Sequence, residues 1–429
     1  MTGRVPSDAA GASGASGATG AADAAGGSDA AVGPVADATF RRLWADLEPI
    51  GRDARTGGYR RLAYTGPELV LREWFAGEAA ARGLDVHEDR AGNLWAWWGD
   101  PAGGDAVVVG SHLDSVVQGG AFDGPLGVVS AFAAVDALRA AGVMPSRPVA
   151  IAAFADEEGA RFGVACGGSR LLTGQLDADR ARALTDDDGV SLAEALRSSG
   201  RDPARLGADP SVVGAIGTYV ELHVEQGRGL VDLGAPVGVG LAIRAHGRWR
   251  FDLDGRADHA GTTRMEDRDD PMLRQARVVV AARDAASRCG GLATVGKVLV
   301  EPGGVNAIPS RVQAWLDARA DDQDTVRAIV TEVAGAAGGG AVEESWTPRV
   351  DLDATLRERL AARLDGAPIL ATGAGHDAGI LAMAGIPTAM LFVRNPTGVS
   401  HAPQEHADLT DCLAGVAALT DVLEDLACR

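Results

Sequence analysis

The residues of this chain best suited to chemistry are histidines and carboxylates that follow short apolar runs. His112 ends the run AVVVGSH, Asp114 comes two residues later, and Asp123 lies in the glycine-rich loop that follows. Imidazole and carboxylate groups are natural ligands of Zn²⁺, Mn²⁺ and similar ions. A single histidine at the end of a strand is more often a core or surface residue, so this motif alone leaves both interpretations open.

Two adjacent glutamates, Glu157 and Glu158, follow the apolar run VAIAAFA and one further acid, Asp156. At the end of a strand, neighbouring side chains point in different directions, so one can bind a metal while the other faces a water molecule. The alternative is that the acidic run begins a helix, whose dipole favours acids in its first turn. The buried character of the preceding run favours the metal site.

His223 in ELHVEQG and His401 in GVSHAPQEH also follow strand-like runs. With the motifs above, they supply three histidines and three carboxylates from separate loops. That set is sufficient for two metal ions that share one bridging carboxylate. The chain contains no HExxH, GxSxG or GxxxxGK[ST] motif, which argues against other common hydrolase types.

The elements that must position these residues are strands alternating with helices. Strand-like runs at 94–99, 106–114 and 148–158 alternate with helical patterns at 67–84 and 127–143. This order predicts an α/β fold with crossover units around a mainly parallel central sheet. The reactive residues follow the carboxyl ends of the strands, where open α/β sheets place their ligands.

The pattern changes after residue 238. Alternating strand patterns at 248–261 and 295–320 are separated by a helical pattern at 271–288, and a second helix is predicted at 325–337. An inserted α+β domain with an antiparallel sheet would use this material. The predicted organisation is a disordered tail rich in Ala, Gly and Ser at 1–36, a di-metal catalytic domain in two parts at 37–238 and 350–429, and the inserted domain at 239–349.

Composition limits the function further. The 429 residues are 46% hydrophobic and 23% charged, as in globular enzymes, and the net charge of -19 argues against nucleic-acid binding, which needs basic surfaces. No apolar run approaches the length of about 20 residues needed to span a membrane, and the start lacks the apolar core of a signal peptide. We therefore predict a cytoplasmic protein without membrane contact. The four cysteines are far apart in the sequence, which predicts free thiols.

The ordered motifs resemble those of the M20 metallohydrolase family. The similarity is greatest to its branch of allantoate amidohydrolases, N-carbamoyl-L-amino-acid hydrolases and β-ureidopropionases, and it runs from about residue 40 to the end. The motifs that carry it are GSHLDS, GGAFDGPLGV, DEEGARFG, ELHVEQG, DHAGTT, GGVNAIPS, GAGHDA and GVSHAPQEH.

The resemblance implies two divalent metal ions per subunit, Zn²⁺ or Mn²⁺, with Co²⁺ or Ni²⁺ as alternatives. It makes His112 and His223 ligands of one ion, Glu158 and His401 ligands of the other, and Asp123 the bridge. It also implies that Asp114 orients His112 from behind. Glu157 becomes the general base, which takes a proton from the attacking water and passes it to the leaving nitrogen.

The resemblance also implies a homodimer, formed through the inserted domain, whose partner completes each site. The matching residues are His259, Asn306 and Arg319, expected from the neighbouring subunit, with Gln226 from the catalytic domain. His259 would stabilise the oxyanion, and Arg319 would form a bidentate pair with a carboxylate of the small-molecule substrate. Without the resemblance, Arg319 would be interpreted as an ordinary strand arginine. His376 is expected to line the substrate crevice.

The implied reaction is hydrolysis of a non-peptide amide or ureido C–N bond in a small carboxylate. Allantoate, with release of ammonia and carbon dioxide, is the first choice, and N-carbamoyl or other N-acyl amino acids are the alternative. A dipeptidase and a metal-binding protein without catalysis are further alternatives; the presence of the base and all five ligands argues against the latter. Arg264 stands where the family usually has proline after AGTT, which leaves the exact substrate open.

Overall fold

The computed structural model describes residues 33–428. The predicted tail at 1–36 lies outside that range except for its last residues, where helix α1 (Pro34–Leu47) begins. Proline is favoured in the first turn of a helix because the missing N–H would have no partner there. Phe40, Leu43 and Leu47 are buried at helical spacing, so they anchor this helix to the core.

A nine-stranded sheet forms the centre of the fold, in the order β1-β2-β4-β3-β5-β15-β6-β13 with β14 beside β6. The four central neighbours β4, β3, β5 and β15 are parallel, and the outer pairs are antiparallel except β14 with β6. The predicted mainly parallel sheet is thus confirmed at its centre. The strands are β1 (Asp85–Glu88), β2 (Leu94–Trp98), β3 (Ala106–His112), β4 (Val149–Phe154), β5 (Ile216–Val224), β6 (Val237–Ile243), β13 (Val350–Asp351), β14 (Ile369–Thr372) and β15 (Thr388–Val393).

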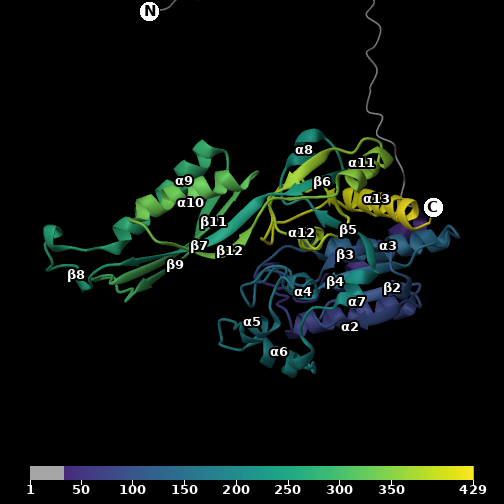
Figure 1. The fold of residues 1–429 in the computed structure, drawn as a ribbon, viewed down its shortest axis with the longest axis horizontal. Helices are drawn as coiled ribbons and strands as arrows, with labels where there is room; N and C mark the ends of the chain where they lie inside the picture. The colour runs from purple at the N-terminus through teal and green to yellow at the C-terminus, as the bar shows by residue number, and fades with distance from the viewer. Residues whose placement is uncertain (1–32, 429) are drawn as a thin grey trace, which may run out of the picture. The chain divides into compact units, whose positions relative to one another are not determined.

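Helices cover both faces of this sheet, as the alternation of side chains along β3 requires. Val107 and Val109 pack into one hydrophobic cluster, while Ala106 and Val108 pack into another on the opposite face. The first cluster includes buried residues of α1, α2 (Gly66–Ala81), α3 (Pro125–Ala140), α11 (Ala354–Arg363) and α13 (Leu409–Ala427). Figure 1 shows α3 and α13 beside the central strands.

The second face is covered by short helices in a region where the sequence patterns predicted no elements. They are α4 (Gly167–Leu172), α5 (Ala178–Ala183), α6 (Leu192–Ser198) and α7 (Pro210–Ala215), with α12 (Asp377–Met383) from later in the chain. Such helices are too short to show a helical period in the sequence. The remaining short elements are α8 (Gly229–Leu233) and the 3₁₀ turns η1 (Pro101–Gly103), η2 (Pro203–Arg205) and η3 (Met265–Asp267).

A separate antiparallel sheet has the order β12-β7-β11-β9 and its own hydrophobic cluster. Two helices, α9 (Pro271–Cys289) and α10 (Gln323–Ala337), lie along this sheet, as predicted (Figure 1). The strands are β7 (Ala245–Asp254), β9 (Leu292–Glu301), β11 (Arg311–Ala320) and β12 (Ala341–Thr347). A two-stranded pair, β8 (Asp258–His259) with β10 (Ala307–Ile308), follows the end of β7.

Two expectations from composition concern the described residues directly. All four cysteines are free thiols, as predicted. None of the helices between residues 33 and 428 has the length and apolar character needed to cross a membrane.

Candidate active site

The parallel strands place the predicted site residues at one edge of the central sheet. His112 ends β3 and pairs in register with Phe154, the last residue of β4, so that Glu157 and Glu158 follow directly beside it. His223 lies near the end of β5, level with Phe392 of β15. The carboxyl ends of four neighbouring strands therefore converge, as their parallel order requires.

Asp123 stands at the centre of the resulting cluster. Its Oδ1 lies 3.4 Å from His112 Nε2 and 3.1 Å from His223 Nε2, while its Oδ2 lies 3.4 Å from His401 Nε2. His401 Nε2 is also 3.4 Å from Glu158 Oε2. One carboxylate thus faces two separate ligand groups, His112 with His223 on one side and Glu158 with His401 on the other.

The nitrogens that face Asp123 fit a divalent cation. His112 Nε2 and His223 Nε2 are both buried, and neither has a hydrogen-bond partner among the described residues, because the short contacts to Asp123 lack hydrogen-bond geometry. The Nδ1 of His223 lies 2.9 Å from the Val224 carbonyl oxygen, which accepts the ring proton there and leaves Nε2 as a free lone pair. Two unshared lone pairs beside a buried carboxylate are what a Zn²⁺ or Mn²⁺ site requires.

The loop of Asp123 is shaped to lie against the imidazole of His112. Gly124 has a φ of 84°, and a β-carbon there would come within 2.5 Å of the His112 ring. Only glycine satisfies both conditions. The close approach places Asp123 opposite the two histidines before α3 begins at Pro125.

Asp114 lies behind the cluster and connects two of its parts. Its Oδ1 is 3.6 Å from His112 Nδ1, and its two carboxylate oxygens accept the backbone N–H groups of Glu157 and Glu158, each at 3.1 Å. The same side chain therefore faces the imidazole and fixes the two-glutamate turn. Of these contacts, only the one between Asp114 and His112 was anticipated from the sequence.

Glu157 lies between the cluster and the core. Its Oε2 is 3.7 Å from His112 Nε2, and the side chain is buried. Burial raises the pKa of Glu157 well above its usual value; His112 opposes this rise, and the nearby carboxyls of Asp377 and Glu158 add to it. A raised pKa makes a carboxylate a stronger base, which suits it to take a proton from water.

Three residues beside the cluster support Asp123 and His223. Gln226, which was predicted, donates from Nε2 to Asp123 Oδ2 at 2.9 Å. Glu405, which was missed, accepts the backbone N–H groups of Phe122 and Asp123 at 2.9 Å. His376 is buried with its ring centroid 4.6 Å from that of His223.

Two buried carboxyls beneath the cluster were also missed. Glu221 lies close enough to His223 and His376 to form a further candidate ligand group, and Asp377 accepts a hydrogen bond from Ser169 Oγ at 2.5 Å. Both stand beside named histidines in the motifs ELHVEQG and GAGHDA. The period of a strand places Glu221 on the same face as His223, and that signal could have identified it.

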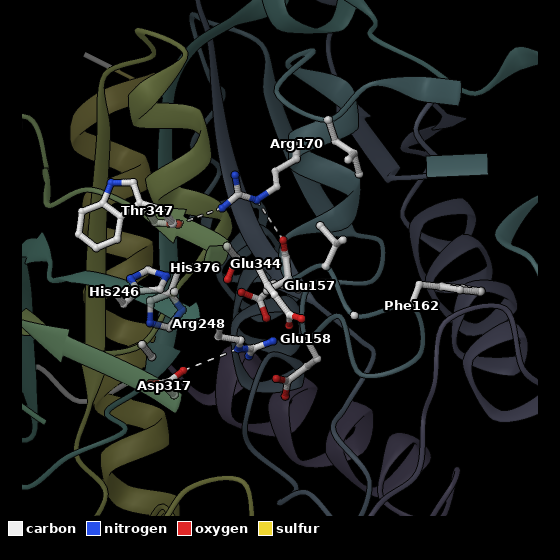
Figure 2. Close-up of a pocket in the computed structure, with 18 of the residues that line it drawn as sticks. Glu157, Glu158, Phe162, Arg170, His246, Arg248, Asp317, Glu344, Thr347 and His376 are labelled. Carbon is white, nitrogen blue, oxygen red and sulfur yellow. Dashed lines mark hydrogen bonds and ion pairs between the residues drawn. The ribbon is translucent and has the colours of Figure 1, made fainter. Parts of the chain in front are cut away.

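A cleft of about 520 Å³ opens from the cluster toward the antiparallel sheet. Figure 2 shows Glu157, Glu158 and His376 facing it together with His246, Arg248 and Asp317. Arg170 of α4 donates to Thr347 Oγ1 at 3.2 Å, which joins the helix to the end of β12 (Figure 2). The lining is rich in charged and amide side chains, and its apolar part includes Phe162, Leu184 and Trp346.

Arg319 lines this cleft within its own chain, whereas the resemblance implied that it reaches the neighbouring subunit. It lies near the last residue of β11, next to the start of β7, and its Nη1 donates to the Gly373 carbonyl at 2.7 Å. The Arg319 Nε and Nη2 groups donate to the carboxylate oxygens of Asp317 at 2.7 and 2.9 Å. The end of β11 that carries Arg319 lies at the cleft.

His259 and Asn306 lie at the other end of the antiparallel sheet and do not line the cleft. The structure brings the two together, since Ala260 N–H donates to the Asn306 carbonyl at 2.9 Å and both side chains are exposed. The ten-residue strand β7, about 30 Å long, separates this pair from His246. Their predicted role thus finds no support within a single chain.

Residues 108–425 match the profile of the peptidase family M20/M25/M40. This chain belongs to that family. It is 38% identical over 403 residues to the N-carbamoyl-L-amino acid amidohydrolase of Geobacillus stearothermophilus, covering 90% of this chain and 98% of the relative. It is 34% identical to the allantoate amidohydrolase of Escherichia coli K12, covering 89% and 96%.

Solved structures of the M20 family agree with the fold. An amidase of the hydantoinase/carbamoylase family from Burkholderia vietnamiensis superposes with a TM-score of 0.83 at 30% identity, covering 91% of this chain and 98% of that one. The predicted M20-family hydrolase, with its α/β sheet and separate antiparallel sheet, is confirmed.

Proposed function

We propose that this M20 hydrolase cleaves a ureido C–N bond in a small carboxylate, with allantoate as its substrate. The observation that carries the proposal is the carboxylate of Asp123 between two ligand groups, with Glu157 buried beside them. That arrangement places an acid–base group within reach of a water held at the cluster. Amidohydrolases among the relatives support the choice of a non-peptide bond.

Two divalent ions, Zn²⁺ or Mn²⁺ with Co²⁺ or Ni²⁺ as alternatives, would be held by the residues already described. His112 and His223 would hold one and Glu158 and His401 the other, with Asp123 between the two groups. When bound, the ions supply Lewis acidity that polarises the substrate carbonyl and acidifies a water molecule. Asp114 keeps His112 and the backbone of Glu157 in the required orientation.

Glu157 transfers the proton. It takes one proton from the attacking water as the new C–O bond forms, and delivers it to the nitrogen as the C–N bond breaks. From allantoate, this yields ammonia and a carbamate that loses carbon dioxide. The raised pKa of Glu157 supports this assignment, because it makes the carboxylate a stronger base toward the attacking water.

Arg319 binds the substrate carboxylate at the opposite wall of the cleft. An arginine has five N–H donors. Three of these donors bind Asp317 and Gly373. One N–H group on each terminal nitrogen is left to form an end-on pair with a substrate carboxylate. Gln226 and His376 line the same cleft and orient the remainder of the substrate.

His259 and Asn306 act on a second subunit in a homodimer. Exposed apolar residues on α9 and on the edge strand β9 support an interface there, since such residues rarely gather on a free surface. They are Met272, Leu273, Val279, Val280, Leu292, Val298 and Leu299. In the dimer, His259 of one chain stabilises the oxyanion formed in the cleft of its partner.

The polar lining of the cleft favours allantoate, which presents two ureido groups and one carboxylate. The second candidate is an N-carbamoyl-L-amino acid, favoured by the 38% identity to an amidohydrolase of that class. Each substrate carries one carboxylate and at least one ureido group, so the same catalytic residues could act on either.

A substrate panel separates the two. The purified enzyme, loaded with Mn²⁺, Zn²⁺ or Co²⁺, is assayed for product from allantoate and from N-carbamoyl, N-formyl and N-acetyl amino acids. We expect ammonia from allantoate at the highest kcat/KM. Absence of ammonia from allantoate with every metal would eliminate it, and turnover of N-carbamoyl amino acids alone would establish the second candidate.

A further inference from the structure

We propose that Cys166 is a positioning residue for Glu157: its thiol donates a hydrogen bond that holds the Glu157 carboxylate toward the cluster. The inference rests on the proposed role of Glu157 as the proton carrier. Cys166 itself does not line the cleft, so it acts through Glu157 and not on the substrate.

The contact is defined on both sides of the carboxylate. Cys166 Sγ lies 3.4 Å from Glu157 Oε1, a normal separation for a thiol donor, while Oε2 of the same group is 3.7 Å from His112 Nε2. One oxygen is therefore occupied by the thiol and the other faces the cluster. Without the thiol, the carboxylate could rotate about its terminal bond, whose rotamers are broad.

The backbone of Cys166 fixes the thiol in place. Its N–H donates to the Glu157 carbonyl at 2.6 Å, so the main chain and side chain of Cys166 both bind the same residue. Cys166 also has a φ of 55°, a left-handed conformation that is unfavourable for a residue with a side chain. Such strain persists only where the surroundings impose it, and it often accompanies functional positions.

The thiol has the protonation state that a donor needs. Burial raises the pKa of Cys166 well above its usual value, and the carboxyls of Glu157 and Asp377 raise it further. The group therefore stays neutral and keeps its proton. A neutral donor orients the carboxylate without adding a charge beside the metal ligands.

The first test compares kinetics of three variants of the metal-loaded enzyme. C166A removes the donor, C166S keeps one, and C412A removes a buried cysteine remote from the cluster as a matched control. We expect C166A to lower kcat about tenfold with KM and metal content unchanged, as for the loss of one hydrogen bond to a charged group. C166S should recover most of kcat, and C412A should match wild type.

The second test needs no substrate. The S–H stretching band of Cys166, isolated as the infrared difference between wild type and C166A, should lie at a lower frequency in wild type than in E157A, where the acceptor is gone. A band that does not move with E157A overturns the hydrogen bond.

The two tests distinguish the possible failures. If no substrate in the panel is turned over but the band shifts, the proposed function fails while the contact stands. If the enzyme is active and C166A matches wild type in kcat, the positioning role is refuted. Equal losses in C166A and C166S, with a lowered Tm in both, would assign Cys166 to packing alone and would also refute it.

Discussion

The carboxyl edge of the central sheet and the far end of the antiparallel sheet both carry family motifs, but the motif residues are buried together at the first and exposed at the second. At the first, His112, Asp123 and His223 are buried and in mutual contact, with nitrogens that lack partners. At the second, His259 is exposed, and its ring Nδ1 accepts a hydrogen bond from Gly261 N–H in its own loop. The first region is complete within one chain. The role proposed for the second depends on a second chain.

The largest effect should come from the buried region. E157Q removes the proton carrier but keeps the volume and the contact to the Asp114 side chain, which uses the backbone. We expect kcat to fall by about a thousandfold, within the range for a lost general base, with both ions retained by elemental analysis. The matched control E358Q, on the exposed face of α11, should be unaffected. Undiminished turnover in E157Q would remove Glu157 from the mechanism.

The second effect compares the two regions in one molecule. R319A and H259A should each lose most activity as homodimers. In a mixed dimer, however, the site that combines wild-type Arg319 of one chain with wild-type His259 of its partner is intact. Random reassociation should therefore restore about a quarter of the wild-type sites, because half the dimers are mixed and each has one good site.

This result would show whether Arg319 acts in the site of its own chain or in that of the neighbouring subunit. If Arg319 and His259 both served the neighbouring subunit, each site of a mixed dimer would contain one defect and no activity would return. The measurement is turnover after co-expression of differently tagged chains, with each homodimer purified separately as the control. A protein that elutes as a monomer would refute the shared site altogether.

Whether the sequence predicts the position of a site residue depends on where that residue lies along its strand. His112, Glu158 and His223 follow parallel strands, so their convergence follows from chain order alone. The position of Arg319 beside its own chain's cleft could not be predicted, because the sequence does not say which end of an antiparallel strand faces the cleft. Glu405 was missed because it contacts a loop far away in the sequence, and Cys166 because its contact to Glu157 depends on a local irregular turn; neither leaves a periodic signal.

A smaller effect separates the two halves of the buried cluster. The His401 side chain is 51% exposed, whereas those of His112 and His223 are 1% exposed. A chelator should therefore remove the ion held by His401 and Glu158 first, in a two-phase release followed by elemental analysis. H401A should weaken the binding of that ion by at least about a hundredfold, because even a hydrogen-bond partner of a ligand contributes about 10- to 100-fold, and the other ion should be retained. Simultaneous loss of both ions would indicate that Asp123 couples them too tightly to be separated.

The smallest effect concerns the exposed loop that carries His259. Arg264 has a φ of -63°, the value that proline requires, and its backbone N–H makes no hydrogen bond within the described part of the chain. Its guanidinium pairs with Asp267 at 2.8 Å, an exposed contact of small energetic value. R264P should thus leave the free energy of unfolding unchanged or raise it by up to about 1 kcal/mol, because proline reduces the freedom of the unfolded chain. Tm should be unchanged or slightly higher.

Kinetics decide whether that rigidity matters for the neighbouring subunit. If His259 reaches the partner's cleft, a stiffer loop should change KM or kcat by about twofold to threefold, with the sign differing between allantoate and N-carbamoyl amino acids. R264A provides the control, because it removes the ion pair without restricting φ. Identical kinetics in R264P, R264A and wild type would show that position 264 has no part in substrate choice. The difference from the family at this position would then be a neutral feature of the loop.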